Sequence, residues 1–399
     1  MSSRPLMSGF PSPESAQVTL ANWRTAPYMT WAFQHVREIV PSADIANSPG
    51  DIWRLESATT DLSSFAFKRG GETYSLSRFT ADTDTDGLVI LHRGKVIHTH
   101  YGNGMTAATP HILMSVSKSL TAIVAGILID KGTLDPDQTV VSIIPELKSS
   151  LYASATVRHV LDMRIGIDFD EDYLATSGAI VEYRKATNWN PLAPGEQPSD
   201  LRTYLSGLVA RNGPDGGPFH YVSTNSDLLG WILERASGIR FADLISNLLW
   251  KPMGAEYPAY ITVDRLGAPR CAGGICTTAM DLARVGQLIV QNGRRNGPAI
   301  IPAGWIEDVF DGGDPNAWAA GDMIAYFGDR AMHYRNKWYV LRDSGIAFGL
   351  GVYGQNVFVD RANELVIAKL SSQPPPLDAN LIDLTIAFVE AIRGWLTRT

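Results

Sequence analysis

The chain has 399 residues, of which 45% are hydrophobic and 19% charged, so it is long enough for two packed regions and too apolar for a disordered protein. Its formal net charge of −7, with no local Lys/Arg cluster, argues against a nucleic-acid partner. The N-terminus lacks a basic-then-apolar secretion signal, and the longest apolar run, residues 120–129, is about half a membrane span. We therefore expect a cytoplasmic protein without a membrane partner.

The first third of the chain predicts the start of a sheet and then a central helix. Residues 87–101 are two β-rich runs around Arg93-Gly94, which favours a hairpin. Residues 116–131 carry apolar side chains on nearly every face and stop at Gly132. This pattern is typical of a helix that is buried all round and ended by a glycine.

Residues 139–275 switch to helical patterns separated by loops rich in proline and glycine. Thr156 and Asp200 stand where two of these helices begin, and Ser226-Asp227 stands before a third helix, which closes at Gly238. The region is predicted to be a mostly helical insert.

The last third of the chain returns to strands and covering helices. In order, the patterns predict a helix at 279–293, an irregular aromatic region at 311–342, β runs at 345–360 and 364–372, and an amphipathic helix at 378–396. Together the elements predict an α/β (α+β) fold. Residues 1–138 and 276–399 would form an antiparallel sheet flanked by helices, and residues 139–275 would form the inserted, mostly helical domain.

Ser115 and Lys118 stand one helical turn apart at the head of the predicted buried helix, and no other lysine follows a serine at that spacing. On one helix face the amine can take the hydroxyl proton, and the free N–H groups of the first turn favour an oxyanion there. Burying an unpaired ammonium costs several kcal/mol, so a lysine at this position needs a reason. The alternative is an ordinary exposed lysine on the first turn.

Tyr221, Ser223 and Asn225 alternate in FHYVSTNSD, so an extended stretch would point all three the same way. Taken alone, the stretch is better explained as a turn-rich helix start. Beside Lys118, Tyr221 gains a role. Lowering a tyrosine pKa from about 10 to about 7 takes about 4 kcal/mol, and a cation about 4 Å away supplies that much. This reasoning predicts Tyr221 as a base.

The cysteines and histidines do not predict a metal site. Cys271 and Cys276 lie five apart without a second pair or a nearby histidine, so two free thiols are the better interpretation. His98 and His100 alternate on one predicted strand, which is more often a solvated edge than a ligand pair. We expect no metal and no cofactor.

Three motifs carry a family resemblance: Ser115-Val-Ser-Lys118, Tyr221-Val-Ser, and the glycine-rich strand at 349–351. In order and spacing they resemble the three boxes of the serine β-lactamase and penicillin-binding-protein superfamily, class C type. Within it the chain most resembles the 6-aminohexanoate-dimer hydrolase (nylon-oligomer hydrolase) group. The likeness runs from about residue 20 to 375 and rests on ILMSVSKSL, VLDMRIGIDFDEDY, FHYVSTNSD, ITVDRLG, GGICTTAMDLARVG and GLGVYGQNVFVD.

The resemblance implies a fold with its active site between the sheet domain and the helical insert, and a set of roles. Ser115 would be the acylated nucleophile, Lys118 and Tyr221 the proton-handling pair, and the backbone N–H groups of Ser115 and Val352 the oxyanion hole. It also implies that four side chains contact substrate: Tyr173 from a mobile loop, Trp189 as the aromatic that closes over substrate, Ser223 and Tyr353. From the sequence alone, Tyr173 and Trp189 are simply aromatics in polar loops.

The chain departs from the family pattern at three places. No lysine stands at 349–351 to hold a substrate carboxylate, and the second box is Tyr-x-Ser rather than Tyr-x-Asn. Arg184 stands where the resemblance implies an acidic residue that receives the amino end of the nylon dimer. Like charges repel, so ester hydrolysis is favoured over cleavage of that dimer.

The expected function is that of a serine hydrolase that cleaves short amides and carboxyl esters through an acyl-enzyme on Ser115. Two alternatives stay open: a β-lactamase or D-alanyl peptidase, and a non-catalytic binding protein with a penicillin-binding fold. The expected partner is a small-molecule ester or amide. The oligomeric state is open, with a homodimer as one possibility.

Overall fold

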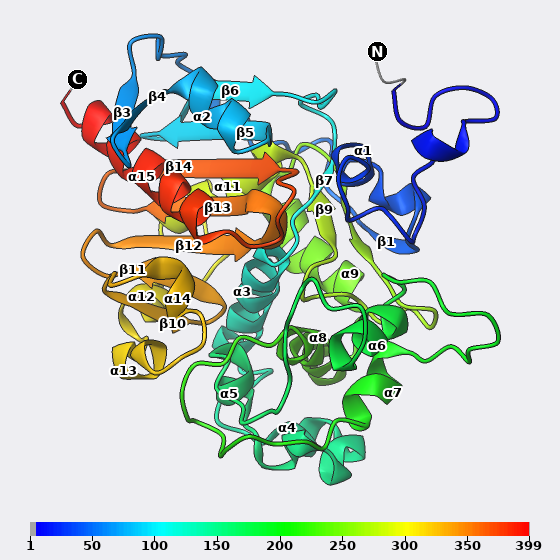
Figure 1. Cartoon of the computed structure of the whole chain (residues 1–399). Helices are drawn as coiled ribbons and strands as arrows, with labels where there is room; N and C mark the ends of the chain where they lie inside the picture. Colours follow the sequence, from blue (N-terminus) through cyan, green and yellow to red (C-terminus); the bar gives the residue numbers. More distant parts are fainter. Residues whose placement is uncertain (1–4, 399) are drawn as a thin grey trace.

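A computed structural model describes residues 5–398. Its upper half in Figure 1 is an eight-stranded sheet, and its lower half is mainly helical. The strand order in the sheet is β10 (Met332–Arg335), β11 (Trp338–Leu341), β12 (Ile346–Gly351), β13 (Gln355–Asp360), β14 (Leu365–Ser371), β5 (Thr85–His92), β6 (Lys95–Tyr101) and β2 (Glu56–Ser57). Neighbours pair antiparallel except β2, which runs parallel to β6. The predicted α/β (α+β) class is confirmed.

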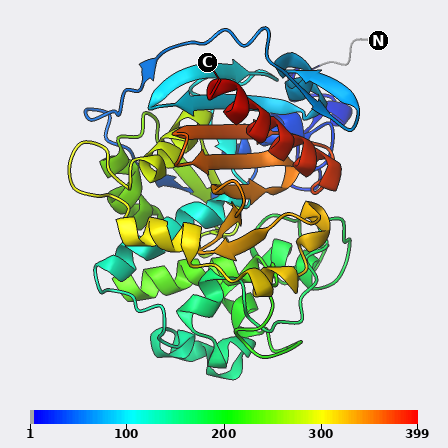
Figure 2. The same cartoon turned by 90° about the vertical axis from the view of Figure 1, so that its left-hand side faces the viewer.

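Helices cover both faces of this sheet. Alternate residues of β5 point in opposite directions, so Val89 and Leu91 join the core under α11 (Ala279–Val290), while Leu88 and Ile90 join the core under α15 (Ala379–Leu396). Figure 2 shows α15 lying across the outer face. The ring of Phe79, from α2 (Leu76–Asp82), stacks on that of Phe388 in α15, with centroids 4.1 Å apart.

The helix predicted at 116–131 is α3 (Val116–Asp130), and it lies between the sheet and the helical half of the molecule. Its residues are buried from Val116 to Leu128, as the apolar pattern predicted. Gly126 packs so closely on Trp305 of α12 (Ala303–Asp311) that a Cβ there would lie 2.3 Å from the indole. The helix ends where Gly132 adopts a φ of +68°.

The lower half contains α4 (Val140–Ile143), α5 (Val157–Leu161), α6 (Ala179–Ala186), α7 (Leu201–Ser206), α8 (Thr224–Ser237), α9 (Phe241–Ile245) and α10 (Lys251–Met253). Thr156 and Asp200 cap α5 and α7 as predicted. The predicted start of α8 at Ser226-Asp227 is wrong, since the helix begins earlier, after Ser223. Asp227 does not cap it because its carboxylate bonds to Tyr183, Arg270 and the Ala272 N–H.

A second sheet joins strands from both sides of the predicted domain boundaries. Its order is β1 (Ser42–Ile45), β8 (Ala259–Thr262), β9 (Ile275–Thr277) and β7 (His111–Ile112). A separate hairpin pairs β3 (Ala66–Arg69) with β4 (Glu72–Ser75). The division into 1–138, 139–275 and 276–399 therefore stays a prediction, and β9 crosses one of its boundaries.

Two predictions for the last third of the chain are wrong. The aromatic region at 311–342 is not irregular, because it contains α13 (Pro315–Ala319), α14 (Ile324–Phe327) and the β10–β11 hairpin. The run at 345–360 is not one strand but β12 and β13, joined by a tight turn. In that turn the buried Tyr353 and the half-buried Gly354 take φ values of +64° and +89°, and no polar turn residue marks the turn in the sequence. Within residues 5–398 no helix is long and apolar enough to cross a membrane.

Candidate active site

Ser115 occupies the N-cap position of α3, directly after a sharp turn that leaves β7. The turn forces Met114 to a φ of +44°, a conformation that residues with a side chain rarely adopt. This strained link presents the Ser115 hydroxyl at the head of the buried helix. The Nζ of Lys118, one turn later, lies 2.6 Å from Ser115 Oγ.

The amine of Lys118 is almost fully buried and has three polar neighbours. Besides Ser115 Oγ, they are Ser223 Oγ at 3.1 Å and the carbonyl oxygen of Ala272 at 2.7 Å. Burial lowers the pKa of Lys118 to about 7, although the carboxylate of Glu171 acts in the opposite direction. The amine is therefore largely uncharged just above neutral pH.

The hydrogen-bond roles around Lys118 assign its lone pair. The Ala272 carbonyl can only accept, so it takes one N–H of the amine. The Ser223 hydroxyl donates its own proton to the carboxylate of Glu171, so it also accepts from Lys118. The position left on Nζ faces Ser115 Oγ. An uncharged Lys118 thus turns its lone pair toward the serine proton.

Glu171 is the main site residue that the sequence did not reveal. Its carboxylate accepts from the Ser223 N–H at 2.5 Å, from the Ser223 hydroxyl, and from the Tyr173 hydroxyl at 3.1 Å. It stands in DFDEDY among several acidic residues, and nothing in that run distinguishes it. Its partner Ser223 lies 52 residues away, so only the fold brings the two together.

Tyr221 lies beside this pair, with the Nζ of Lys118 4.9 Å from the centroid of its ring. Burial and then Glu171 raise the pKa of its phenol above the usual value, while a hydrogen bond with Ser115 lowers it. The expectation that the lysine cation makes Tyr221 a base at neutral pH therefore has the wrong sign. Tyr221 keeps its proton and can donate it.

The alternation predicted for Tyr221, Ser223 and Asn225 is interrupted by the start of α8. Ser223 is the N-cap residue and Asn225 is already helical. The side-chain amide of Asn225 faces the sulfur of Met163 at 3.9 Å instead of the site. The backbone of Tyr221 is fixed by a hydrogen bond, which its N–H donates to the carboxylate of Asp322 at 3.1 Å.

Two backbone N–H groups, those of Ser115 and Val352, border the same space. The end of β12 approaches α3 so closely that a Cβ on Gly351 would lie 2.9 Å from Ser115 N and 2.6 Å from Leu113 O. Only glycine permits this approach. Among residues 5–398 neither N–H group donates to a protein acceptor, so both are free to bind an oxyanion.

A cavity of about 30 Å³ adjoins Ser115, which is room for a water molecule rather than for an ester. All four side chains that the resemblance assigned to substrate contact line it: Tyr173, Trp189, Ser223 and Tyr353. We call it the inner cavity. Trp189 is fixed by its N–H, which donates to Thr262 Oγ1 at 3.2 Å, and by edge-to-face contact with Trp23.

A second cavity, of about 550 Å³ and open to solvent, lies on the other side of Glu171 and Tyr173, which border both spaces. We call it the outer cavity. Tyr221 lines the outer cavity, whereas Ser115 and Val352 line the inner one. Tyr173 thus belongs to a wall between the nucleophile and solvent.

Arg184, on α6, also lines the inner cavity. Its buried guanidinium donates to the carbonyl oxygens of Tyr173 at 3.0 Å and Asp172 at 3.4 Å, so it ties the wall segment to α6. The sequence did not reveal two further arginines of this cavity, Arg24 and Arg270.

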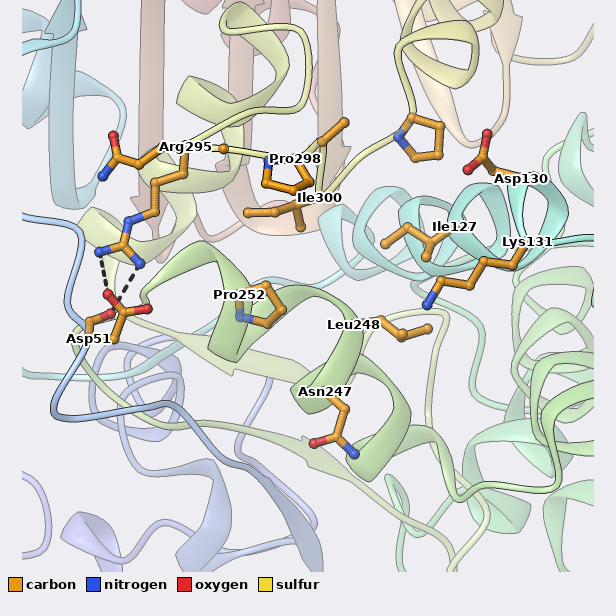
Figure 3. A pocket seen from close by; sticks show the side chains of 14 residues that line it. Asp51, Ile127, Asp130, Lys131, Asn247, Leu248, Pro252, Arg295, Pro298 and Ile300 are labelled. Carbon is orange, nitrogen blue, oxygen red and sulfur yellow. Dashed lines mark hydrogen bonds and ion pairs between the residues drawn. The ribbon is translucent and has the colours of Figure 1, made fainter.

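A third cavity, of about 580 Å³, lies elsewhere (Figure 3). It is bordered by Ile127 and Lys131 at the opposite end of α3, about 22 Å from Ser115 for a helix of this length, and by the ion pair of Arg295 with Asp51. None of the candidate catalytic residues lines it. The two cysteines are buried free thiols, as predicted.

Comparison with known proteins adds the family. The β-lactamase family model matches residues 76–391. A 6-aminohexanoate-dimer hydrolase of Paenarthrobacter ureafaciens is 34% identical over 372 residues, which cover 92% of this chain and 91% of that protein. The solved structure described as "Putative 6-aminohexanoate-dimer hydrolase from Bacillus anthracis" aligns with a TM-score of 0.88 and 26% identity over 97% of this chain and 99% of that one.

A more distant structure, a family VIII carboxylesterase, shares the fold with a TM-score of 0.58 at 15% identity, over 78% of this chain and 94% of that one. The resemblance seen in the sequence motifs is thus confirmed across most of the molecule. The chain belongs to the β-lactamase family and is a hydrolase related to 6-aminohexanoate-dimer hydrolase.

Proposed function

We propose that the protein is a serine hydrolase that cleaves short amides and carboxyl esters through an acyl-enzyme on Ser115. The observation that carries the proposal is the 2.6 Å contact between Ser115 Oγ and the Nζ of Lys118, an amine whose pKa burial lowers to about 7. An uncharged amine at that distance can take the serine proton.

Acylation begins when Ser115 Oγ attacks the substrate carbonyl and its proton passes to Lys118. The negative charge that develops on the carbonyl oxygen is bound by the N–H groups of Ser115 and Val352. The Tyr221 phenol, which keeps its proton, protonates the leaving amine or alcohol. The proton now on Lys118 restores the phenol, so the pair is neutral again in the acyl-enzyme.

Deacylation repeats these steps with water as the nucleophile. Water attacks the acyl carbon, the Lys118/Tyr221 pair takes its proton, and Ser115 Oγ leaves with a proton from the same pair. The names of the related hydrolases support amides and esters as the substrate class.

The first test is Ser115→Ala with p-nitrophenyl hexanoate as substrate. Turnover should fall by about four orders of magnitude or more, as for loss of a catalytic nucleophile. Ser119→Ala is the matched control, because its hydroxyl lies one turn further on the same helix and donates to Lys337 O, away from Lys118. Undiminished turnover in Ser115→Ala would refute the proposal.

The second test separates the roles of the pair. Tyr221→Phe should slow the hydrolysis of an alkyl amide by about 10² or more, because the amine must leave protonated. The same variant should slow acylation by p-nitrophenyl hexanoate much less, because p-nitrophenolate leaves without a proton. Burst and steady-state kinetics on matched hexanoyl substrates measure both. Equal losses for the two substrates would show that Tyr221 is not the proton donor.

A further inference from the structure

The inner cavity carries an excess of positive charge. Three guanidinium groups line it, those of Arg24, Arg184 and Arg270, against the single carboxylate of Glu171. Arg270 is paired with Asp227. Arg24 and Arg184 form no ion pair with any carboxylate in residues 5–398, and the buried Nε of Arg24 has no hydrogen-bond partner there. Glu171 is already engaged by Ser223 and Tyr173.

This arrangement is electrostatically costly without a ligand. Burial, against an opposing contribution from Tyr353 and together with smaller contributions from the charges of Arg184 and Arg270, lowers the pKa of Arg24 to about 10. Burial also lowers the pKa of Arg184. Like charges in a partly desolvated space repel strongly, so an anion between them would relieve the repulsion.

The outer cavity has the opposite charge. Five carboxylates line it, and no lysine or arginine does; they are Asp168, Asp170, Glu171, Asp172 and Asp322. Most of these side chains are exposed, so water and salt screen them more than they screen the half-buried Arg24 and the buried Arg184 and Arg270. A substrate that extends through both cavities therefore meets positive charge at its inner end and negative charge at its outer end.

The chemistry decides which half of the substrate lies in which cavity. The leaving group must face its proton donor, and Tyr221 borders the outer cavity. The acyl group must then extend from Ser115 toward Arg24 and Arg184 in the inner cavity, which has room for it only once the wall formed by Tyr173 and Glu171 has opened.

From this geometry we propose that the preferred substrates carry a carboxylate on the acyl side of the scissile bond, so that they are monoesters or monoamides of short dicarboxylic acids with a neutral or cationic leaving group. Arg24 and Arg184 bind that carboxylate, and hydrolysis releases the dicarboxylic acid. The inference rests on the proposed serine-hydrolase function and adds the charge and orientation of its substrate. The same pair of arginines would repel an acyl group that carries an ammonium.

The test uses two isomeric esters that differ only in the position of the carboxylate. Monohexyl adipate carries it on the acyl side, and 6-(hexanoyloxy)hexanoate carries it on the leaving side. We expect kcat/KM to be about tenfold or more higher for monohexyl adipate, the value of one charge-assisted hydrogen bond. In Arg184→Gln and in Arg24→Gln the ratio should fall toward one. Two variants are used because Arg184 also holds the wall segment by hydrogen bonds, whereas the hydrogen bonds of Arg24 within residues 5–398 go to Trp189 and Asn190.

Arg235→Gln is the matched control, because its exposed pair with Glu146 lies outside both cavities, and the ratio should not change. A binding measurement is independent of turnover: calorimetry on Ser115→Ala should show adipate binding at least about tenfold more tightly than hexanoate. Equal kcat/KM for the isomers, or equal binding of adipate and hexanoate, would overturn the inference. Ser115-dependent cleavage of p-nitrophenyl hexanoate beside either result would leave the proposed hydrolase function standing.

Discussion

The side chain of Lys118 sets the pH range in which Ser115 can lose its proton. With a pKa near 7, the amine is protonated in acid and cannot accept a proton there. The kcat/KM for p-nitrophenyl hexanoate should therefore fall about tenfold per pH unit below about 7 and level off above it. A pH–rate profile measures this. A profile that stays flat from pH 5 to 8 would show that Lys118 is not the base.

Glu171→Gln tests the charge behind that profile. The Glu171 carboxylate raises the pKa of Lys118, so removing the charge should move the acidic limb of the profile to lower pH. The plateau should also fall, because the carboxylate orients the Ser223 hydroxyl. Asp170→Asn is the control, because it removes the charge of an exposed neighbouring carboxylate, and it should not change the pH at which the rate falls on the acidic side. A limb that moves to higher pH in Glu171→Gln would contradict this electrostatic account.

At the scale of residues, the sequence revealed what is local in the chain. Ser115 and Lys118 lie three positions apart on one helix, so their contact follows from helical geometry alone. Glu171, Arg24 and Arg270 reach the site through the tertiary fold, and their sequence surroundings are ordinary. Even the sign of the pKa shift of Tyr221 depended on burial, which the motif does not specify.

At the scale of elements, the approach of β12 to α3 forms the candidate oxyanion hole. In Gly351→Ala the added Cβ would press on the backbone of Leu113 and Ser115, so the two N–H groups should move apart. We expect kcat to fall by about 10², as for loss of one oxyanion donor. Steady-state kinetics with p-nitrophenyl hexanoate measure the loss, and the melting temperature reports any accompanying destabilisation.

Gly349→Ala is the control for this change. A Cβ at residue 349 would first meet the side chain of Ser119 at 3.0 Å, which can yield, and it lies away from Ser115. Its effect on kcat should be much smaller. Full activity in Gly351→Ala would show that the close approach is not needed for catalysis.

The end of β12 also shows which turns a sequence pattern does not predict. The hairpin at 85–101 was predictable because Arg93-Gly94 supplies a recognisable turn between two β runs. The β12–β13 hairpin was not, because Val352 and Tyr353, in its turn, are buried and apolar. The turn is specified by the site it helps to form and not by local turn preference.

At the scale of the whole molecule, an ionic cluster around the buried Asp162 joins the sheet to the helical half. Asp162, just after α5, accepts from Arg335 at 2.7 Å and from the Asn336 N–H at 3.0 Å, both in the β10–β11 hairpin. Asp162→Ala would leave the half-buried Arg335 paired with Asp308 alone and would remove the acceptor of the buried Asn336 N–H, so it should lower the free energy of unfolding by about 2 kcal/mol. Denaturant unfolding measures the change.

Asp44→Ala is the comparison, because its ion pair with Arg37 is exposed and should contribute about 1 kcal/mol or less. Equal losses in the two variants would mean that the cluster does not hold the halves together.

The overall architecture was predictable because the motif order resembled a known family. The opposite charges of the two cavities were not predictable, since they arise from arginines and carboxylates brought together from distant segments.

The wall formed by Tyr173 and Glu171 has a consequence for selectivity. The free space beside Ser115, about 30 Å³, is too small for an ester, so a substrate must displace that wall before it can be attacked, and the enzyme at rest leaves most esters intact. The apparent affinity for a substrate is then the affinity of the open form multiplied by the fraction of molecules that are open. Contacts that the substrate makes only after entry must compensate for that loss. Even a highly reactive acylating reagent would modify Ser115 no faster than the protein opens.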